Sequence, residues 1–213
     1  MGRKKLRRFA DLATFANVFE EGGGLKGRWC ARYFKNEHPI FLELACGKAE
    51  HTLESAKRFP QGNFIGIDIK GERIWKGATT AVQEGLARVA FIRTRIENLA
   101  DFFAENEVYE IWITFPDPFP KKRQIKRRLT APGYLQLYKE ILRPGGRIHL
   151  KTDDQNLYEY TLATVQLCQG RVCQATEDLY RTPDCNDWTS FKTTYERRHL
   201  AAGKTIKYLC FTF

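Results

Sequence analysis

Pro39-Ile40-Phe41-Leu42-Glu43-Leu44-Ala45-Cys46-Gly47-Lys48-Ala49 is the stretch that decides the fold. Its first six residues form an apolar run too short for a helix, and small residues follow, so it predicts a buried strand entering a tight turn. A helix is expected over residues 49–59, and a second apolar run follows at residues 63–67. The order strand, helix, strand predicts two parallel strands joined by a right-handed crossover.

The same alternation continues along the chain. Further strands are expected at residues 89–92, 110–115 and 147–150, with helices near residues 71–86, 97–105 and 132–142. Alternation of this kind predicts a buried parallel sheet with helices on its faces. Two more strands, at residues 171–179 and 206–213, predict a hairpin added to that sheet. We therefore expect one α/β domain over residues 39–213, after a basic arm and helical addition at residues 1–38.

Composition narrows the class of protein. The chain has 213 residues, of which 43% are hydrophobic, and a formal net charge of +10. That surplus favours a polyanionic partner, although solubility alone could account for it. Six cysteines without a C-x-x-C pair argue against a zinc knuckle, and the four scattered histidines suggest no metal site. Without a signal peptide or membrane-spanning run, a cytoplasmic protein is expected, with no membrane partner.

The first two strands predict a cofactor site, because open parallel sheets bind ligands where their strands end. Gly47 lies in the turn after the first strand, and small residues there let the backbone approach a ligand closely. Asp68 ends the second strand about 20 residues later, where an acid can accept hydrogen bonds from ribose hydroxyls. Together they favour an adenosine-containing cofactor, and the lack of G-x-G-x-x-G argues against NAD. An ordinary turn and a helix cap would use the same residues.

The fourth strand runs into the most distinctive segment, residues 114–129. Three prolines within residues 116–120 stiffen the loop, so Asp117 is expected on a rigid turn at the ligand-binding edge. Positions 121–128 then carry six cations: Lys121, Lys122, Arg123, Lys126, Arg127 and Arg128. A solvated basic loop is the plain interpretation, but its place beside the expected pocket favours RNA binding.

These motifs resemble those of the bacterial tRNA (guanine-N7-)-methyltransferase family. Residues 116–128 match its signature P-D-P-W-P-K-K-R-H-x-K-R-R, except for Phe119 in place of Trp and Gln124 in place of His. Residues 193–196 match a second signature, T-x-[FY]-E, and residues 151–153 a third, Lys-Thr-Asp. The matches run from about residue 40 to residue 198.

The resemblance implies a class I methyltransferase fold: a Rossmann-like three-layer sandwich with a mostly parallel seven-stranded sheet and an antiparallel C-terminal strand. It implies S-adenosylmethionine as cofactor and guanosine 46 of the tRNA variable loop as the target. The implied cofactor contacts are Glu43, Gly47, Asp68, Arg95 and Asp117. The implied substrate contacts are Lys121, Asp153, Thr193, Thr194, Tyr195 and Glu196. The family has Asp or Asn near position 95, so Arg95 departs from its pattern.

A hypothesis for the chemistry follows from the acceptor. Guanine N7 has a free lone pair, so methyl transfer needs positioning and no prior deprotonation. Asp117 is the candidate for stabilising the positive charge that develops on the ring, while Asp153 and Glu196 could accept hydrogen bonds from the guanine edge. Two alternatives stay open: a methyltransferase of another substrate, and a noncatalytic RNA-binding protein of the same fold.

Overall fold

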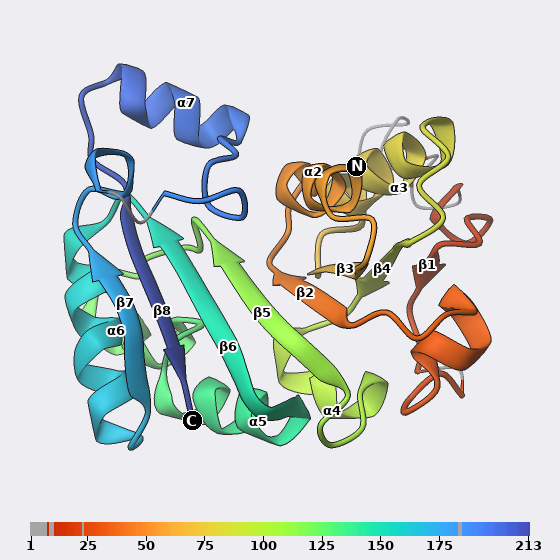
Figure 1. Ribbon diagram of the computed structural model, residues 1–213, viewed down its shortest axis with the longest axis horizontal. Coiled ribbons are helices and arrows are strands. Elements are labelled where there is room, and N and C mark those ends of the chain that lie inside the picture. The colour runs from red at the N-terminus through yellow and green to blue at the C-terminus, as the bar shows by residue number, and fades with distance from the viewer. Residues whose placement is uncertain (1–7, 9–10, 23, 183–184) are drawn as a thin grey trace.

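The computed structural model describes residues 8, 11–22, 24–182 and 185–213. Within these ranges one sheet has eight strands in the order β1-β4-β3-β2-β5-β6-β8-β7 (Figure 1). Only β8 is antiparallel to its neighbours, β6 and β7. The strands are β1 Val18–Phe19, β2 Ile40–Leu44, β3 Asn63–Asp68, β4 Val89–Arg93, β5 Val108–Thr114, β6 Leu142–Thr152, β7 Arg171–Thr176 and β8 Lys207–Thr212.

Helices cover both faces of the sheet and give it three layers (Figure 1). The helices longer than one turn are α2 Glu50–Arg58, α3 Gly71–Gln83, α5 Pro132–Ile141, α6 Gln155–Leu167 and α7 Thr194–Ala201, and the short α4 is Leu99–Phe102. One apolar cluster packs α4, α5 and α6 against the sheet, and a second packs α2 and α3 against the other face. Alternate residues of β2 serve the two clusters: Leu42 joins the first and Phe41 the second, as the pleat of a strand requires.

The core strands lie where the sequence predicts them. All residues of β2 and β3 are buried, and strands buried on both faces appear in a sequence as continuous apolar runs. The expected seven strands gain an eighth, β1, which pairs with β4 at the edge of the sheet. Two helices, α6 and α7, were not expected. Of the expected N-terminal helical addition, the structure shows a six-residue π-helix at Trp29–Phe34; residues 3–7 of the basic arm lie outside the described ranges.

The topology fixes where a site can form. β2, β3, β4 and β5 are parallel neighbours, so their carboxyl ends meet at one edge of the sheet. β3 and β5 both flank β2, which brings Asp68 at the end of β3 to the same edge as the loop that carries Asp117. Helix α7 lies above this edge, over the ends of β5 and β6 (Figure 1).

Candidate active site

A cavity of about 490 Å³ opens at the carboxyl ends of β2 and β5. It brings together parts of the chain that are far apart in sequence: the turn after β2, the end of β5 and the first turn of α7. Five of the predicted site residues line it, namely Glu43, Gly47, Thr193, Thr194 and Tyr195. The cofactor side and the substrate side expected from the sequence therefore share one cleft.

Glu43 forms a buried acidic floor in this cleft. Its side chain accepts a hydrogen bond from Thr114 Oγ1 at 2.6 Å through one oxygen, and from the backbone N–H of Thr52 at 2.9 Å through the other. The hydroxyl of Thr52 donates to that second oxygen as well. Burial raises the pKa of Glu43 from 4.5 to about 7, against the effect of these hydrogen bonds. A cation placed above Glu43 would favour the ionised carboxylate and offset part of the free-energy cost of burying its charge.

The turn after β2 presents backbone to the cleft. Ala45, Gly47 and Ala49 all have positive φ, at 54°, 59° and 62°. Such angles suit glycine and strain alanine, and strain of this kind gathers where the backbone approaches a ligand. Asp68 fixes the turn from the neighbouring strand, because its Oδ2 accepts a hydrogen bond from Gly47 N at 2.9 Å and its Oδ1 from Lys70 N at 2.8 Å.

A second, smaller cavity of about 190 Å³ continues from this turn. Ala45 lines both cavities, and Asp68 and Arg95 line the smaller one with Thr94 and Glu97. The structure thus brings Arg95 to the position expected for the far end of an elongated cofactor. The two cavities are therefore neighbours at the ends of β2, β3 and β4.

His51 is a site residue that the sequence did not reveal, since an isolated histidine on a helix carries no distinctive pattern. It lies in the first turn of α2, lines the larger cavity and packs at 4.8 Å from the ring of Trp112. Burial lowers its pKa from 6.5 to about 3, and the nearby charge of Lys151 adds to this effect. The imidazole is therefore neutral at physiological pH, and among the described residues its Nε2 has no hydrogen-bond partner.

The loop after β5 carries the reacting side of the predicted site. Phe115 and Phe119, each directly before a proline, have positive φ, at 50° and 43°, a conformation that strains residues other than glycine. Phe115 lines the cavity and lies 5.1 Å from the ring of Tyr195. Asp117 is exposed on this loop, and its charge is near enough to affect Tyr195: burial raises the pKa of that hydroxyl, and Asp153 and Asp117 add to the rise.

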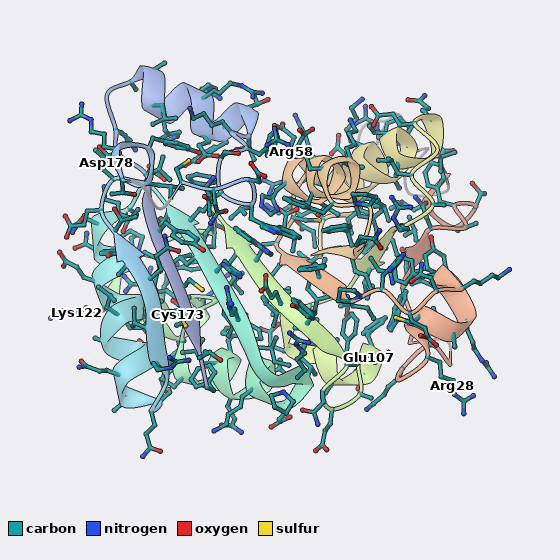
Figure 2. The ribbon with its side chains drawn as sticks, in the orientation of Figure 1. Arg28, Arg58, Glu107, Lys122, Cys173 and Asp178 are labelled. Carbon is teal, nitrogen blue, oxygen red and sulfur yellow. The ribbon has the colours of Figure 1, made fainter. Side chains whose placement is uncertain are left out.

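The basic loop turns away over α6. Arg128 is buried and braces the loop, donating hydrogen bonds to the carbonyls of Pro118 at 2.9 Å and Phe119 at 3.3 Å. The other five cations, among them Lys121, are exposed. Figure 2 shows Lys122 on the outer side of the molecule beside α6. Lys121 lines neither cavity, so the structure does not bring it together with the other predicted substrate contacts.

Asp153 lies beside the cleft and is bonded to α7 and the chain after it. Its carboxylate accepts hydrogen bonds from Lys204 Nζ at 2.6 Å and from Tyr195 Oη at 3.4 Å, and lies 3.0 Å from His199 Nδ1. Burial acts to raise the pKa of Asp153, but Lys204 and His199 hold it below its ordinary value. Asp153 is therefore an anionic acceptor within reach of the exposed ring of Tyr195.

Glu196 has a different environment from the other predicted substrate contacts. Its side chain is 0% exposed, and its Oε1 lies 2.7 Å from Lys151 Nζ while its Oε2 accepts from Thr193 N at 3.2 Å. In this conformation the Glu196 carboxylate is out of reach of a substrate. Tyr195, which is 46% exposed, and Thr194, which is also exposed, are the members of the segment that face outward.

The described part of the chain shows no group of three or more His, Cys, Asp or Glu side chains that could hold a metal ion. None of its helices has the length and hydropathy needed to cross a bilayer.

Another cavity, of about 510 Å³, lies toward the other ends of the strands, where Pro39, Tyr109 and Arg147 line it. It contains none of the predicted site residues.

Comparison with known sequences agrees with this arrangement. A family model described as "Putative methyltransferase" matches residues 37–209. A tRNA (guanine-N(7)-)-methyltransferase of Porphyromonas gingivalis is 50% identical over 212 residues, covering 94% of this chain and 86% of the relative. A protein of the same name from Christiangramia forsetii is 47% identical over 221 residues and covers 99% of both chains.

Solved structures agree on the fold. A structure described as an antibiotic-related methyltransferase has a TM-score of 0.65 at 13% identity and covers 84% of this chain and 90% of its own. A 16S rRNA (adenine(1408)-N(1))-methyltransferase of Catenulisporales acidiphilia has a TM-score of 0.61 at 16% identity, covering 85% and 88%. The family model covers most of the chain, and the similar relatives match it over nearly its whole length. The protein therefore belongs to the tRNA (guanine-N(7)-)-methyltransferase family.

Proposed function

We propose that this protein transfers a methyl group from S-adenosylmethionine to N7 of a guanosine in tRNA. The observation that carries the proposal is the shared cleft, which both the buried Glu43 and the exposed Tyr195 line. Relatives that are 47% and 50% identical to this chain carry the name tRNA (guanine-N(7)-)-methyltransferase. A cytoplasmic location accompanies this proposal, because that is where a bacterial tRNA substrate is found.

The two neighbouring cavities suit the methyl donor. S-adenosylmethionine supplies a methyl group on a positively charged sulfonium, and it has no phosphate that would need a glycine-rich cradle. Asp68 and Arg95 in the smaller cavity would hold the ribose and adenine end. Glu43 and the backbone of the turn at residues 45–49 would hold the methionine end, where the ionised carboxylate of Glu43 would attract the positive charge of the donor.

The acceptor side uses Tyr195, Asp153 and Asp117. A guanine ring can stack on an exposed aromatic ring such as Tyr195. Asp153 would accept hydrogen bonds from the N1–H and amino group of guanine, which adenine does not offer in that pattern. Because N7 carries a free lone pair, no residue has to remove a proton before transfer. Asp117 would then stabilise the positive charge that appears on the base.

The basic loop would bind the tRNA around its target. Its five exposed cations lie on the loop that follows β5, so they can neutralise phosphates of an RNA whose base enters the cleft. Guanine N7 is hidden in the deep groove of an A-form helix, so the target must lie outside a regular duplex. Position 46 of the variable loop meets that condition and is the target we propose.

Incubation with unmodified tRNA and donor labelled in its methyl group tests the proposal. Nuclease digestion should place the label on N7 of guanosine, and a transcript with adenosine at position 46 should take up none. Label on adenine or on protein would identify a different methyltransferase. Calorimetry with the donor separates an enzyme from a noncatalytic RNA-binding protein, because only the enzyme should bind it.

A further inference from the structure

A buried ion pair lies beneath the substrate side of the cleft. Lys151, near the end of β6, has a side chain 1% exposed, and its Nζ lies 2.7 Å from Oε1 of Glu196, whose side chain is 0% exposed. Neither residue lines the cleft. Two charges removed from water cost several kcal/mol each unless they compensate each other and have their remaining hydrogen bonds satisfied.

The remaining hydrogen bonds of Lys151 go to the chain that leads into α7. Its ammonium donates to the carbonyls of Thr189 and Phe191, both at 3.1 Å, and to Tyr180 Oη at 3.2 Å. Tyr180 in turn donates to Glu196 at 2.5 Å. A single ammonium therefore fastens the end of β6 to residues 189–191, which directly precede α7.

The carboxylate of Glu196 also starts the helix. Its Oε2 accepts from Thr193 N, while Thr193 Oγ1 accepts from Glu196 N, both at 3.2 Å. This reciprocal capping box satisfies two N–H groups that the first turn of α7 would otherwise leave unpaired. Thr194 and Tyr195 lie between the two capping residues and line the cleft, so their position depends on where Glu196 is held.

We propose that Lys151 is a positioning residue: its ammonium, acting through Glu196 and the carbonyls of Thr189 and Phe191, holds the first turn of α7 over the cleft. Apolar residues of similar volume often give equal or greater stability than a buried ion pair. What the pair supplies here is a fixed position for Thr194 and Tyr195. The kinetic part of this inference rests on the proposed function, because it assumes that these residues meet the substrate.

Lys151→Met tests the inference by removing the charge and keeping much of the volume. We expect kcat/KM for tRNA to fall by about 100-fold, as displacements of about 1 Å in a site can do. The Kd for S-adenosylmethionine should stay within about twofold, because Asp68 and the turn after β2 do not contact Lys151. Hydrogen exchange over residues 189–201 should become faster than in the wild type.

Two further variants distinguish positioning from stability. Lys151→Met combined with Glu196→Gln removes the unpaired buried charge and keeps a capping side chain, so it should recover stability but not kcat/KM. The matched control is His149→Leu, a buried residue of the same strand whose ring nitrogens lie by Tyr208 and Glu110. It should lower the melting temperature and leave kcat/KM within about twofold.

Recovery of both stability and kcat/KM in the double variant would overturn the inference, and so would unchanged exchange over residues 189–201 in Lys151→Met. An equal loss of donor binding and turnover would show general unfolding. Failure of the wild type to methylate tRNA would remove the proposed function. The exchange measurement would still decide whether Lys151 holds α7.

Discussion

Glu43→Gln should stabilise the folded protein at alkaline pH while weakening its binding of the methyl donor. In the folded chain burial raises the pKa of Glu43 from 4.5 to about 7, and one pKa unit corresponds to about 1.4 kcal/mol. At a pH between the two pKa values, 4.5 and about 7, Glu43 is ionised in the unfolded chain and protonated in the folded chain. Stability therefore falls as the pH rises through this window, and above it the ionised carboxylate costs the folded state about 3 kcal/mol.

Glutamine removes this cost and keeps the local hydrogen bonds. Its carbonyl oxygen can accept from the N–H of Thr52, and its amide can donate to the hydroxyl of Thr114. Urea unfolding should show a gain of about 3 kcal/mol at pH 8 and of about 1 kcal/mol or less at pH 5. Calorimetry should show S-adenosylmethionine bound about tenfold more weakly at pH 8, as expected when a charged acceptor becomes neutral.

The pH dependence provides the internal control. The affinity of the wild type for the donor should fall as the pH drops below 7, because Glu43 becomes protonated, and the affinity of Glu43→Gln should not follow that curve. Equal stability changes at pH 5 and pH 8 would refute the reasoning, since they could not arise from ionisation of this carboxyl. A variant less stable than the wild type at pH 8 would refute it as well.

Three further predictions concern other parts of the molecule. A Cβ added at Gly77 would lie 2.9 Å from that of Ala49, so Gly77→Ala should cost about 1–3 kcal/mol in urea unfolding. Adding Ala49→Gly should recover most of that loss, and a double variant no more stable than the single one would contradict this packing. Asp117→Ala should lower kcat about 100-fold; unchanged turnover with intact donor affinity would dismiss its role. Binding of tRNA should weaken steeply with salt, and Lys122→Ala should reduce the slope of log K against log salt by about 1, whereas an unchanged slope would place Lys122 outside the interface.

The parallel strands could be predicted because the feature that determines each strand, its apolar run, lies within the strand's own sequence. Strands buried on both faces need continuous apolar runs, and β2 to β5 each contain one. Helix α6 escaped prediction because Thr161 and Thr164 interrupt its buried face; each donates its hydroxyl to a carbonyl one turn earlier, so burial costs little. Asp154 was the missed signal, since its side chain caps the helix by accepting from Leu157 N at 2.7 Å.

The candidate site also contains residues that the sequence predicts and residues whose position only the structure shows. Residues at strand tips, such as Glu43 and Asp68, could be predicted because the ends of parallel strands share one edge. The interior position of Glu196 could not, because it depends on Lys151, which reaches it from a distant strand. The segment Thr193 to Glu196 matches a family signature and also has the spacing of a capping box. Only the structure shows that Glu196 forms the capping box of α7 in this conformation.

The pairing of β7 with β8 bears on how this family can change its substrates. Thr176 and Tyr208 are partners in that antiparallel ladder, so everything between them, α7 included, is an excursion from the tip of a hairpin. The entropy needed to close such an excursion grows only with the logarithm of its length. Loop closure therefore sets little limit on its length. The limit comes from packing, because Trp188 stacks on Phe59 and Trp112 and Lys151 fastens the segment to β6. Moving RNA preference between enzymes by grafting that segment would therefore require its partners in the sheet to be moved with it, Lys151 above all.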